Sequence, residues 1–228
     1  MVLIDEAHNL MDVITSMQSV NVSYSQLQRA RAQLLRYLQK FQKRLKGKNR
    51  IYVTQVVRLI DSLSNYLARH IDKVGLDGIV TTTTKSRKQS ATATEGQVDI
   101  ADLISGKGTD QINLFKLSRY LQESNLARKV NDYVSNEEEA HHSNSPTFAA
   151  SSSGAKNQTV PILMHIQSFL LTLMNPSVEG KFFYEQAQDG SGELYLKYTL
   201  LDPTQHFKDI VDDARAVILA GGTMTPVG

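Results

Sequence analysis

Apolar residues recur along the chain with two different periods. Two stretches, residues 24–45 and 50–74, carry apolar side chains at steps of three and four, which is the period of an amphipathic helix. The residues between them, 46–49, include the glycine and the asparagine that a tight reversal needs. This pattern predicts an antiparallel helical hairpin.

Shorter patterns predict the other regular elements. Helical spacing recurs in four further segments, residues 98–104, 112–134, 160–174 and 204–213. Alternation of apolar and polar residues predicts strands at 181–185 and 193–200, joined by a glycine-rich turn at 189–192 that is typical of a hairpin. Two polar, aperiodic segments, about 79–97 and 136–158, are predicted to be disordered loops.

Each end of the chain has an apolar strand pattern that runs into a short polar motif. Residues 2–4 precede Asp5-Glu6-Ala7-His8, and residues 216–220 precede Gly221-Gly222-Thr223-Met224. Strand then helix at 1–20, and helix then strand at about 203–228, suit two neighbouring elements of one parallel sheet. The chain between them leaves this sheet and returns, which predicts an insertion. The predicted fold class is α+β and mostly α-helical.

The first motif looks like the Walker B (DEAH) box of a nucleic-acid-dependent ATPase. A strand that ends in Asp-Glu at the edge of an open α/β sheet puts two carboxylates where phosphates and Mg²⁺ bind. Asp5 would hold Mg²⁺ through its water shell, and Glu6 would orient and deprotonate the attacking water. The alternative is that both acids only cap the helix that follows.

Composition limits the other kinds of site. The 228 residues carry a net charge of +2 and include no cysteine, which excludes disulfides and cysteine-ligated zinc or iron–sulfur sites within this chain. No apolar run reaches the roughly 18 residues that span a bilayer, and no targeting signal follows Met1. We therefore expect a soluble intracellular setting without a membrane partner.

Basic residues gather around the predicted helical reversal. The candidate DNA-binding side chains are Arg36, Lys40, Lys43, Arg44, Lys46, Lys48 and Arg50. Only Asp61 and Asp72 oppose the basic residues of the hairpin, whereas a solvated helix face would normally intersperse glutamates for ion pairs. The pattern favours binding to the phosphate backbone of a nucleic acid, which would be sensitive to salt and independent of sequence.

Two further features have both a functional and a structural interpretation. The acidic and apolar segment from Asp99 to Ile104 follows a predicted loop and is either a docking peptide for a protein partner or simply the start of a helix. Tyr184, Tyr195 and Tyr198 lie in the predicted strands, where they either stack on bases or pack within the sheet.

The two end motifs together resemble a known family. Asp5-Glu6-Ala7-His8-Asn9-Leu10, a long helical insertion, and then residues 200–203 and 214–224 are similar to the XPD-like group of iron–sulfur DEAH helicases. The Gly221-Gly222-Thr223-Met224 form looks like the ChlR branch, the sister-chromatid-cohesion helicases, because XPD itself would have Ser-Gly-Thr-Leu. Residues 22–194 would then form the Arch domain, and residues 1–21 and 195–228 would belong to the RecA-like motor domain 1.

The resemblance implies an ATP-dependent helicase that moves 5′ to 3′ on single-stranded or forked DNA, in the nucleus, in cohesion, replication and repair. Asp5 and Glu6 would serve Mg²⁺ and water, and His8 would link the nucleotide to the DNA side. Gly222 and Thr223, in the motif that begins at Gly221, would couple hydrolysis to movement. The implied cofactors are ATP, Mg²⁺ and a [4Fe-4S] cluster whose cysteines lie outside this chain. The implied protein partners are replisome or cohesion proteins, docking on the loops or on Asp99 to Ile104.

The chain also departs from the family pattern. The Walker A lysine, the four cluster cysteines and the second motor domain are not in this sequence. We therefore expect this chain alone neither to hydrolyse ATP efficiently nor to unwind DNA. The alternative function is that of a non-enzymatic helical module whose basic hairpin binds DNA or a protein, and a third possibility is that the hairpin only props the Arch.

Overall fold

A parallel pair of strands brings the two ends of the chain together. The computed structural model describes residues 1–80, 95–106, 108–142, 161–175, 178–187 and 192–221, with the backbone alone at 71–80 and 138–142. In it β1 (Val2–Ile4) pairs with β6 (Val217–Leu219), and the 3-10 helix η1 (Ala7–Asn9) and α1 (Leu10–Gln18) follow β1. Helix α8 (Thr204–Asp213) precedes β6, which confirms the predicted parallel arrangement.

The predicted helical hairpin is formed by α2 (Tyr24–Phe41) and α3 (Gly47–Val80). A capping box starts α2: the Gln26 amide donates to Ser23 Oγ at 3.2 Å, and the Ser23 amide donates to Gln26 Oε1 at 3.1 Å. Buried apolar side chains on α2 pack against α3 in the core. The predicted ends were wrong, since α2 ends before residue 45 and α3 continues beyond residue 74.

A four-stranded antiparallel sheet lies beside the hairpin. Its strands are β2 (Val20–Ser23), β3 (Glu95–Val98), β4 (Gly180–Gln186) and β5 (Leu194–Leu200), in the order β2-β5-β4-β3. Alternate residues of β5 are buried, as the period of two predicted. The hairpin of β4 and β5 is thus confirmed, while the short edge strands β2 and β3 were not predicted.

Four more helices complete the helical part: α4 (Ile100–Leu103), α5 (Leu114–Ser124), α6 (Leu126–His142) and α7 (Ile162–Thr172). The single helix predicted at 112–134 is divided, because Asn125 adopts a left-handed conformation with φ 51° that ends α5. Helix α7 packs against α2, α6 and β2. The aromatic rings of Phe169, Phe182 and Tyr198 meet in the core where α7 covers the sheet.

The two segments predicted to be disordered contain regular structure at their edges. Helix α3 continues to Val80, β3 begins at Glu95, and α6 continues to His142, so regular structure extends into the edges of the segments predicted at about 79–97 and 136–158. Residues 81–94 and 143–160 lie outside the described residues. No helix in the described part of the chain combines the length and apolar character needed to cross a membrane. The α+β, mostly helical fold class is confirmed.

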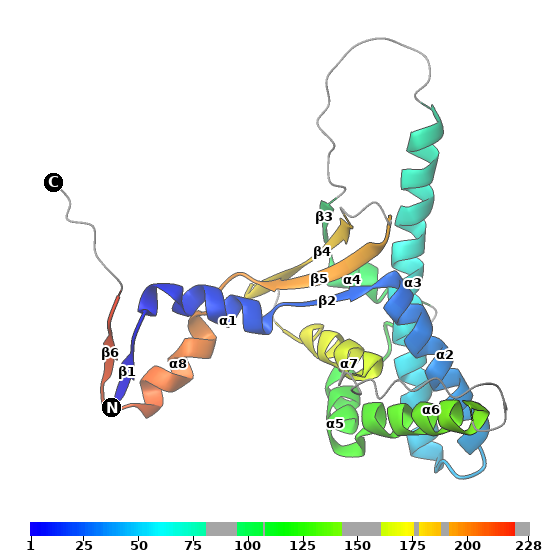
Figure 1. The fold of residues 1–228 in the computed structure, drawn as a ribbon. Coiled ribbons are helices and arrows are strands. Elements are labelled where there is room, and N and C mark those ends of the chain that lie inside the picture. Colours follow the sequence, from blue (N-terminus) through cyan, green and yellow to red (C-terminus); the bar gives the residue numbers. More distant parts are fainter. Residues whose placement is uncertain (81–94, 107, 143–160, 176–177, 188–191, 222–228) are drawn as a thin grey trace.

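Figure 1 shows how these parts are arranged. The β1–β6 pair, with α1 and α8, lies at one end of the molecule, and the α2–α3 hairpin with α5 and α6 lies at the other. Strands β2, β4 and β5 connect the two regions, and α1 contacts β5. The acidic motif and the basic reversal therefore lie on different parts of the fold.

Candidate nucleotide site and basic hairpin

The parallel strand pair places the two end motifs at the same edge of the sheet. Ile4 lies opposite Leu219, and beyond the strands the Ala220 amide donates to the Ile4 carbonyl at 2.8 Å. The Ala7 amide then donates to the Ala220 carbonyl, also at 2.8 Å. These two hydrogen bonds hold Asp5 and Glu6 beside Gly221. The carboxyl ends of parallel strands are where open α/β sheets bind phosphates.

The chain turns sharply at the acidic pair. Glu6 has φ 51° and ψ 40°, a left-handed conformation that is uncommon for a residue other than glycine. The Glu6 amide donates to Asp5 Oδ1 at 2.9 Å, which supports the turn from strand to helix. Both side chains are exposed to solvent. The pair thus presents two carboxylates at the open edge of the sheet.

His8 lies next to the second carboxylate. Its Nδ1 is 3.2 Å from Glu6 Oε2, and the two side chains are 55% and 61% exposed. A contact so exposed contributes little to stability. The structure brings together all three residues predicted to be catalytic.

Capping does not explain the two acids. Glu6 precedes η1 and its side chain makes no capping hydrogen bond, Asp5 accepts from the Glu6 amide before η1 begins, and the residue that precedes α1 is Asn9 and not an acid. The alternative in which the acids only cap a helix is therefore not supported. Asp5 instead matches the carboxylates by which Mg²⁺ is held, with the remaining positions left to water and phosphate. Within the described residues no cluster of three or more His, Cys, Asp or Glu could hold a metal by itself.

The coupling motif is described only at its first residue. Gly221 is exposed, and a methyl group added at this position would meet no atom within 4 Å. Gly222 and Thr223 lie outside the described residues. The roles given to them stay predictions.

The seven candidate DNA-binding residues surround the reversal of the helical hairpin, and all seven are exposed. Arg36 and Lys40 lie in the last turns of α2, and Lys48 lies in the first turn of α3. The first turn of α3 contains no acidic residue, although the helix dipole favours acids there. Lys48 therefore lies where the helix dipole disfavours a cation, whereas Lys40 lies in the last turn of α2, where the dipole favours one.

These cations are not neutralised by the rest of the described structure. Asp61 pairs with Arg31 across α2 and α3, and Asp72 has no described side chain. Among the described residues, none of the seven forms an ion pair. The reversal therefore carries a concentrated positive charge, as the sequence predicted.

Sequence reasoning missed a polar hollow beside this reversal. It has a volume of about 690 Å³ and lies between α2 and α6, where Arg36 and Lys40 face Tyr133 and Glu137. The Tyr133 hydroxyl donates to Glu137, and this hydrogen bond raises the pKa of the tyrosine. Only the tertiary contact between α2 and α6 brings these residues together, so spacing along the chain could not have found them.

The two weaker candidates have structural roles. Leu103 in the segment from Asp99 to Ile104 is fully buried, and its carbonyl accepts a hydrogen bond of 2.7 Å from Ser62 Oγ. The apolar side of this segment therefore faces the core and is not free to dock. Tyr198 is also fully buried and cannot stack on bases, the Tyr184 ring packs on His70 at 4.6 Å between centroids, and the Tyr195 hydroxyl donates to Glu193 Oε2 at 3.2 Å.

Comparison with known proteins identifies relatives over nearly the whole chain. "ATP-dependent DNA helicase chl1" of Aspergillus niger is 50% identical over 226 residues, which are 99% of this chain and 22% of that protein. The proteins of the same name in Sclerotinia sclerotiorum and Schizosaccharomyces pombe are 43% and 37% identical, again over 99% of this chain and over 23% and 25% of theirs. No protein-family model matches the chain.

These matches confirm the resemblance to the ChlR branch of XPD-like helicases. The chain spans about a quarter of the length of the curated relatives it matches. Each complete relative therefore has regions that this chain does not contain.

Proposed function

We propose that this chain is part of an ATP-dependent 5′ to 3′ DNA helicase, to which it supplies the Mg-ATP hydrolysis motif and a DNA-guiding Arch. The observation that carries the proposal is the pairing of β1 with β6, which holds the Asp5-Glu6 motif beside Gly221. Two motifs more than 200 residues apart in sequence meet at one sheet edge, as they must if nucleotide hydrolysis is to be coupled to movement.

Each residue of the acidic motif has a distinct proposed role. Asp5 would hold Mg²⁺ through water, and the metal would neutralise charge on the transferred phosphate. Glu6 would orient the attacking water and accept its proton. His8, in contact with Glu6, would link the nucleotide to the DNA side. Gly221, Gly222 and Thr223 would transmit the state of the nucleotide to the rest of the motor.

The residues of this chain could bind some of the proposed cofactors but not all of them. The exposed carboxylates of Asp5 and Glu6 suit a hydrated Mg²⁺ bound to ATP, but the chain lacks the phosphate-binding lysine motif of such sites. It also contains no cysteine, so any [4Fe-4S] cluster of the parent protein would be ligated outside this chain. The isolated chain is accordingly proposed to be inactive as an ATPase.

The remainder of the chain is proposed to form the Arch. Residues 1–21 and 195–228 would belong to motor domain 1 and residues 22–194 to the Arch. Because the whole of β5, from Leu194 to Leu200, pairs with β4, the structure supports placing the end of the Arch after Leu200 and not after residue 194. Single-stranded or forked DNA would pass beneath the Arch, in the nucleus, where replisome or cohesion proteins would contact it.

The test of the catalytic assignment is Glu6→Gln in the complete parent protein. This change keeps the shape of the side chain and removes the base, so DNA-stimulated ATP hydrolysis should be lost while ATP binding is retained. Glu95→Gln, at another exposed glutamate, is the control and should leave turnover unchanged. Normal hydrolysis in the Glu6 variant would refute the assigned role.

A second candidate function, a non-enzymatic module that binds DNA or a protein, is favoured by the uncompensated charge at the helical reversal. The test is charge reversal of Lys43, Arg44, Lys46 and Lys48 to glutamate in the 228-residue chain. If these residues contact phosphates, the negative slope of log affinity against log salt for single strands should decrease in magnitude by up to about 3.

The matched control for this test reverses four exposed basic residues elsewhere, Lys129, Lys181, Lys208 and Arg215. It produces the same change in net charge without touching the reversal. Equal affinities in the two variants would show that the basic reversal does not bind DNA. A folded chain that binds neither DNA nor protein would favour a hairpin that only props the Arch.

A further inference from the structure

A second hollow lies between the start of α3 and the start of α5. Its volume is about 300 Å³, at the lower end of the range of about 300–1,000 Å³ for small-ligand pockets. Lys48, Ile51 and Tyr52 line it from α3, and Asn113 and Lys116 line it from the start of α5. The hollow is therefore continuous with the basic surface proposed to meet DNA.

Its lining combines three kinds of chemistry. Tyr52 supplies an aromatic ring that is held in place by stacking on Tyr120, with centroids 4.5 Å apart and planes at 18°. Gln55 and Gln111 supply amides that can donate to and accept from the edge of a base. No carboxylate is found among the described residues that line the hollow.

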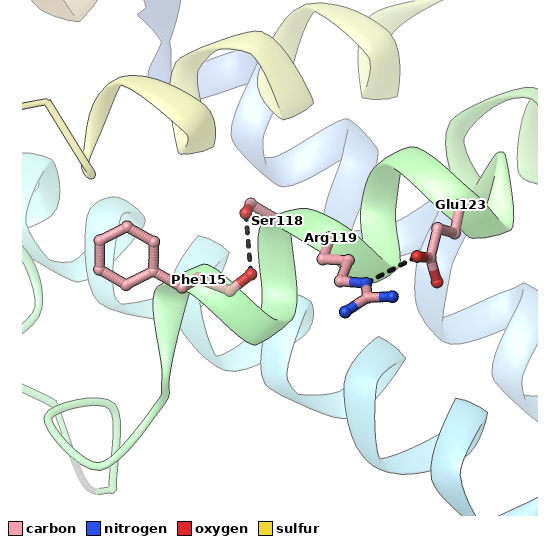
Figure 2. A network of polar contacts seen from close by, with 4 residues as sticks. All are labelled: Phe115, Ser118, Arg119 and Glu123. Atoms are coloured by element: carbon pink, nitrogen blue, oxygen red, sulfur yellow. Dashed lines mark hydrogen bonds and ion pairs between the residues drawn. The ribbon is translucent and has the colours of Figure 1, made fainter.

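The cations at this hollow are available for phosphate. Figure 2 shows α5, where Arg119 Nε donates to Glu123 Oε1 at 2.7 Å and is neutralised by this pair. Neither Lys48 nor Lys116 forms an ion pair among the described residues. The two lysines thus leave a net positive charge at the hollow.

The residue before Lys116 in the chain has an exposed aromatic ring. Phe115 precedes Lys116 in the first turn of α5, is 73% exposed, and extends away from the helix in Figure 2. Isolated exposed apolar residues are common, but a large ring next to unpaired cations is the combination that binds single-stranded nucleic acid. Stacking on the ring is tolerant of sequence because every base has an aromatic face.

We propose that this hollow holds one nucleotide of single-stranded DNA, with Lys48 and Lys116 on its phosphates and Phe115 stacked on a neighbouring base. The inference rests on the proposed function, since it gives the basic hairpin a defined contact with the strand. The nucleotide site would mean that the Arch contacts the bases of the strand as well as its phosphates. A single-nucleotide contact of this kind would limit slippage without selecting a sequence.

The first experiment measures affinity of the folded 228-residue chain for a thymidine oligonucleotide and for one of the same length with abasic sites. Stacking predicts about tenfold weaker binding of the abasic strand. Phe115→Ala should weaken binding of the thymidine strand by a similar factor and bind both strands equally, and Phe115→Tyr should restore the difference. Met164→Ala, at another exposed apolar residue, is the control.

The second experiment locates the contact by photo-cross-linking with 5-iododeoxyuridine in the strand. Trypsin should release the adduct on residues 51–58 or 108–116, which contain Tyr52 and Phe115. Equal binding of normal and abasic strands, together with adducts elsewhere, would overturn the nucleotide site while leaving phosphate binding by the hairpin intact. A folded chain with no affinity for single strands would overturn both.

Discussion

The amide of Ala7 donates a hydrogen bond of 2.8 Å to the carbonyl of Ala220, more than 200 residues later in the chain. This bond lies just beyond the ends of β1 and β6, where the acidic motif and the glycine motif begin. A shift of either strand by one residue would break it. The register of a three-residue strand pair therefore sets the spacing between the two motifs.

The effect of the left-handed Glu6 backbone on stability can be measured separately from the catalytic role of its side chain. A non-glycine residue held there costs about 1–3 kcal/mol, and a β-branched residue fits worst. We expect Glu6→Gly to keep or slightly raise the free energy of unfolding, and Glu6→Val to lower it by about 1–2 kcal/mol. Urea unfolding followed by circular dichroism measures both. If the Val variant is as stable as the parent chain, the φ value is not maintained in solution.

The elements that could be predicted from the sequence were those with a periodic pattern of apolar residues. The steps of three and four in 24–45 and 50–74 led to α2 and α3, and the alternation in 193–200 led to β5. Strands β2 and β3 were missed because four residues contain too little alternation to detect. They are strands because β5 and β4 offer them hydrogen bonds.

The candidate site could also be predicted only in part. Asp5, Glu6 and His8 are nearly contiguous, so their proximity follows from the motif itself. The left-handed turn at Glu6 could not be read from its side chain. The hollow lined by Tyr133 and Glu137 depends on how α6 crosses α2, which no local pattern contains.

A close contact at Gly180 should make this position intolerant of any side chain. A methyl group there would lie 2.3 Å from the Tyr198 hydroxyl and 2.8 Å from the Thr199 carbonyl, and Tyr198 is fully buried. We expect Gly180→Ala to lower the free energy of unfolding by about 1–3 kcal/mol. Gly47→Ala is the control, because nothing lies within 4 Å of a methyl group there and alanine favours the helix. Thermal unfolding measures the stability of the two variants. Equal losses of stability would contradict the proposed contact.

Glu193 should make the chain sensitive to acid. Hydrogen bonds from Ser25 and Ser23 at the start of α2, followed by Tyr195, lower the pKa of Glu193 below its ordinary value of 4.5. A lowered pKa means that the ionised form stabilises the fold above pH 4.5, and this contribution is lost as the pH falls through the folded-state value.

The experiment for Glu193 compares stability at about pH 6 with stability at about pH 3. Glu193→Gln cannot titrate, so it should lose less stability over this interval than the parent chain. Glu95→Gln is the control, since it removes another exposed carboxylate, on the edge strand β3, and leaves the hydrogen bonds from Ser25, Ser23 and Tyr195 in place. Identical pH profiles for Glu193→Gln and the parent chain would contradict the role of these hydrogen bonds.

Two serines on α3 provide a test of how the segment from Asp99 to Ile104 is held. Ser62 Oγ donates to the Leu103 carbonyl at 2.7 Å in a buried setting, whereas the buried Ser64 Oγ has no hydrogen-bond partner among the described residues. Removing the Ser62 donor would leave a buried carbonyl unpaired, so Ser62→Ala should lower the free energy of unfolding by about 1–3 kcal/mol. Ser64→Ala removes an unpaired polar atom from the core and should be neutral or stabilising.

The two serine variants differ by two positions on one helix and delete the same hydroxyl group, so effects on helix propensity cancel in the comparison. Hydrogen exchange at residues 100–104 adds a local measure: exchange should rise in Ser62→Ala and stay unchanged in Ser64→Ala. If α4 exchanged as fast in the parent chain as in the Ser62 variant, the segment would be only loosely attached to α3. Docking of a protein partner on Asp99 to Ile104 would then be open again, because the apolar side of the segment would no longer be committed to the core.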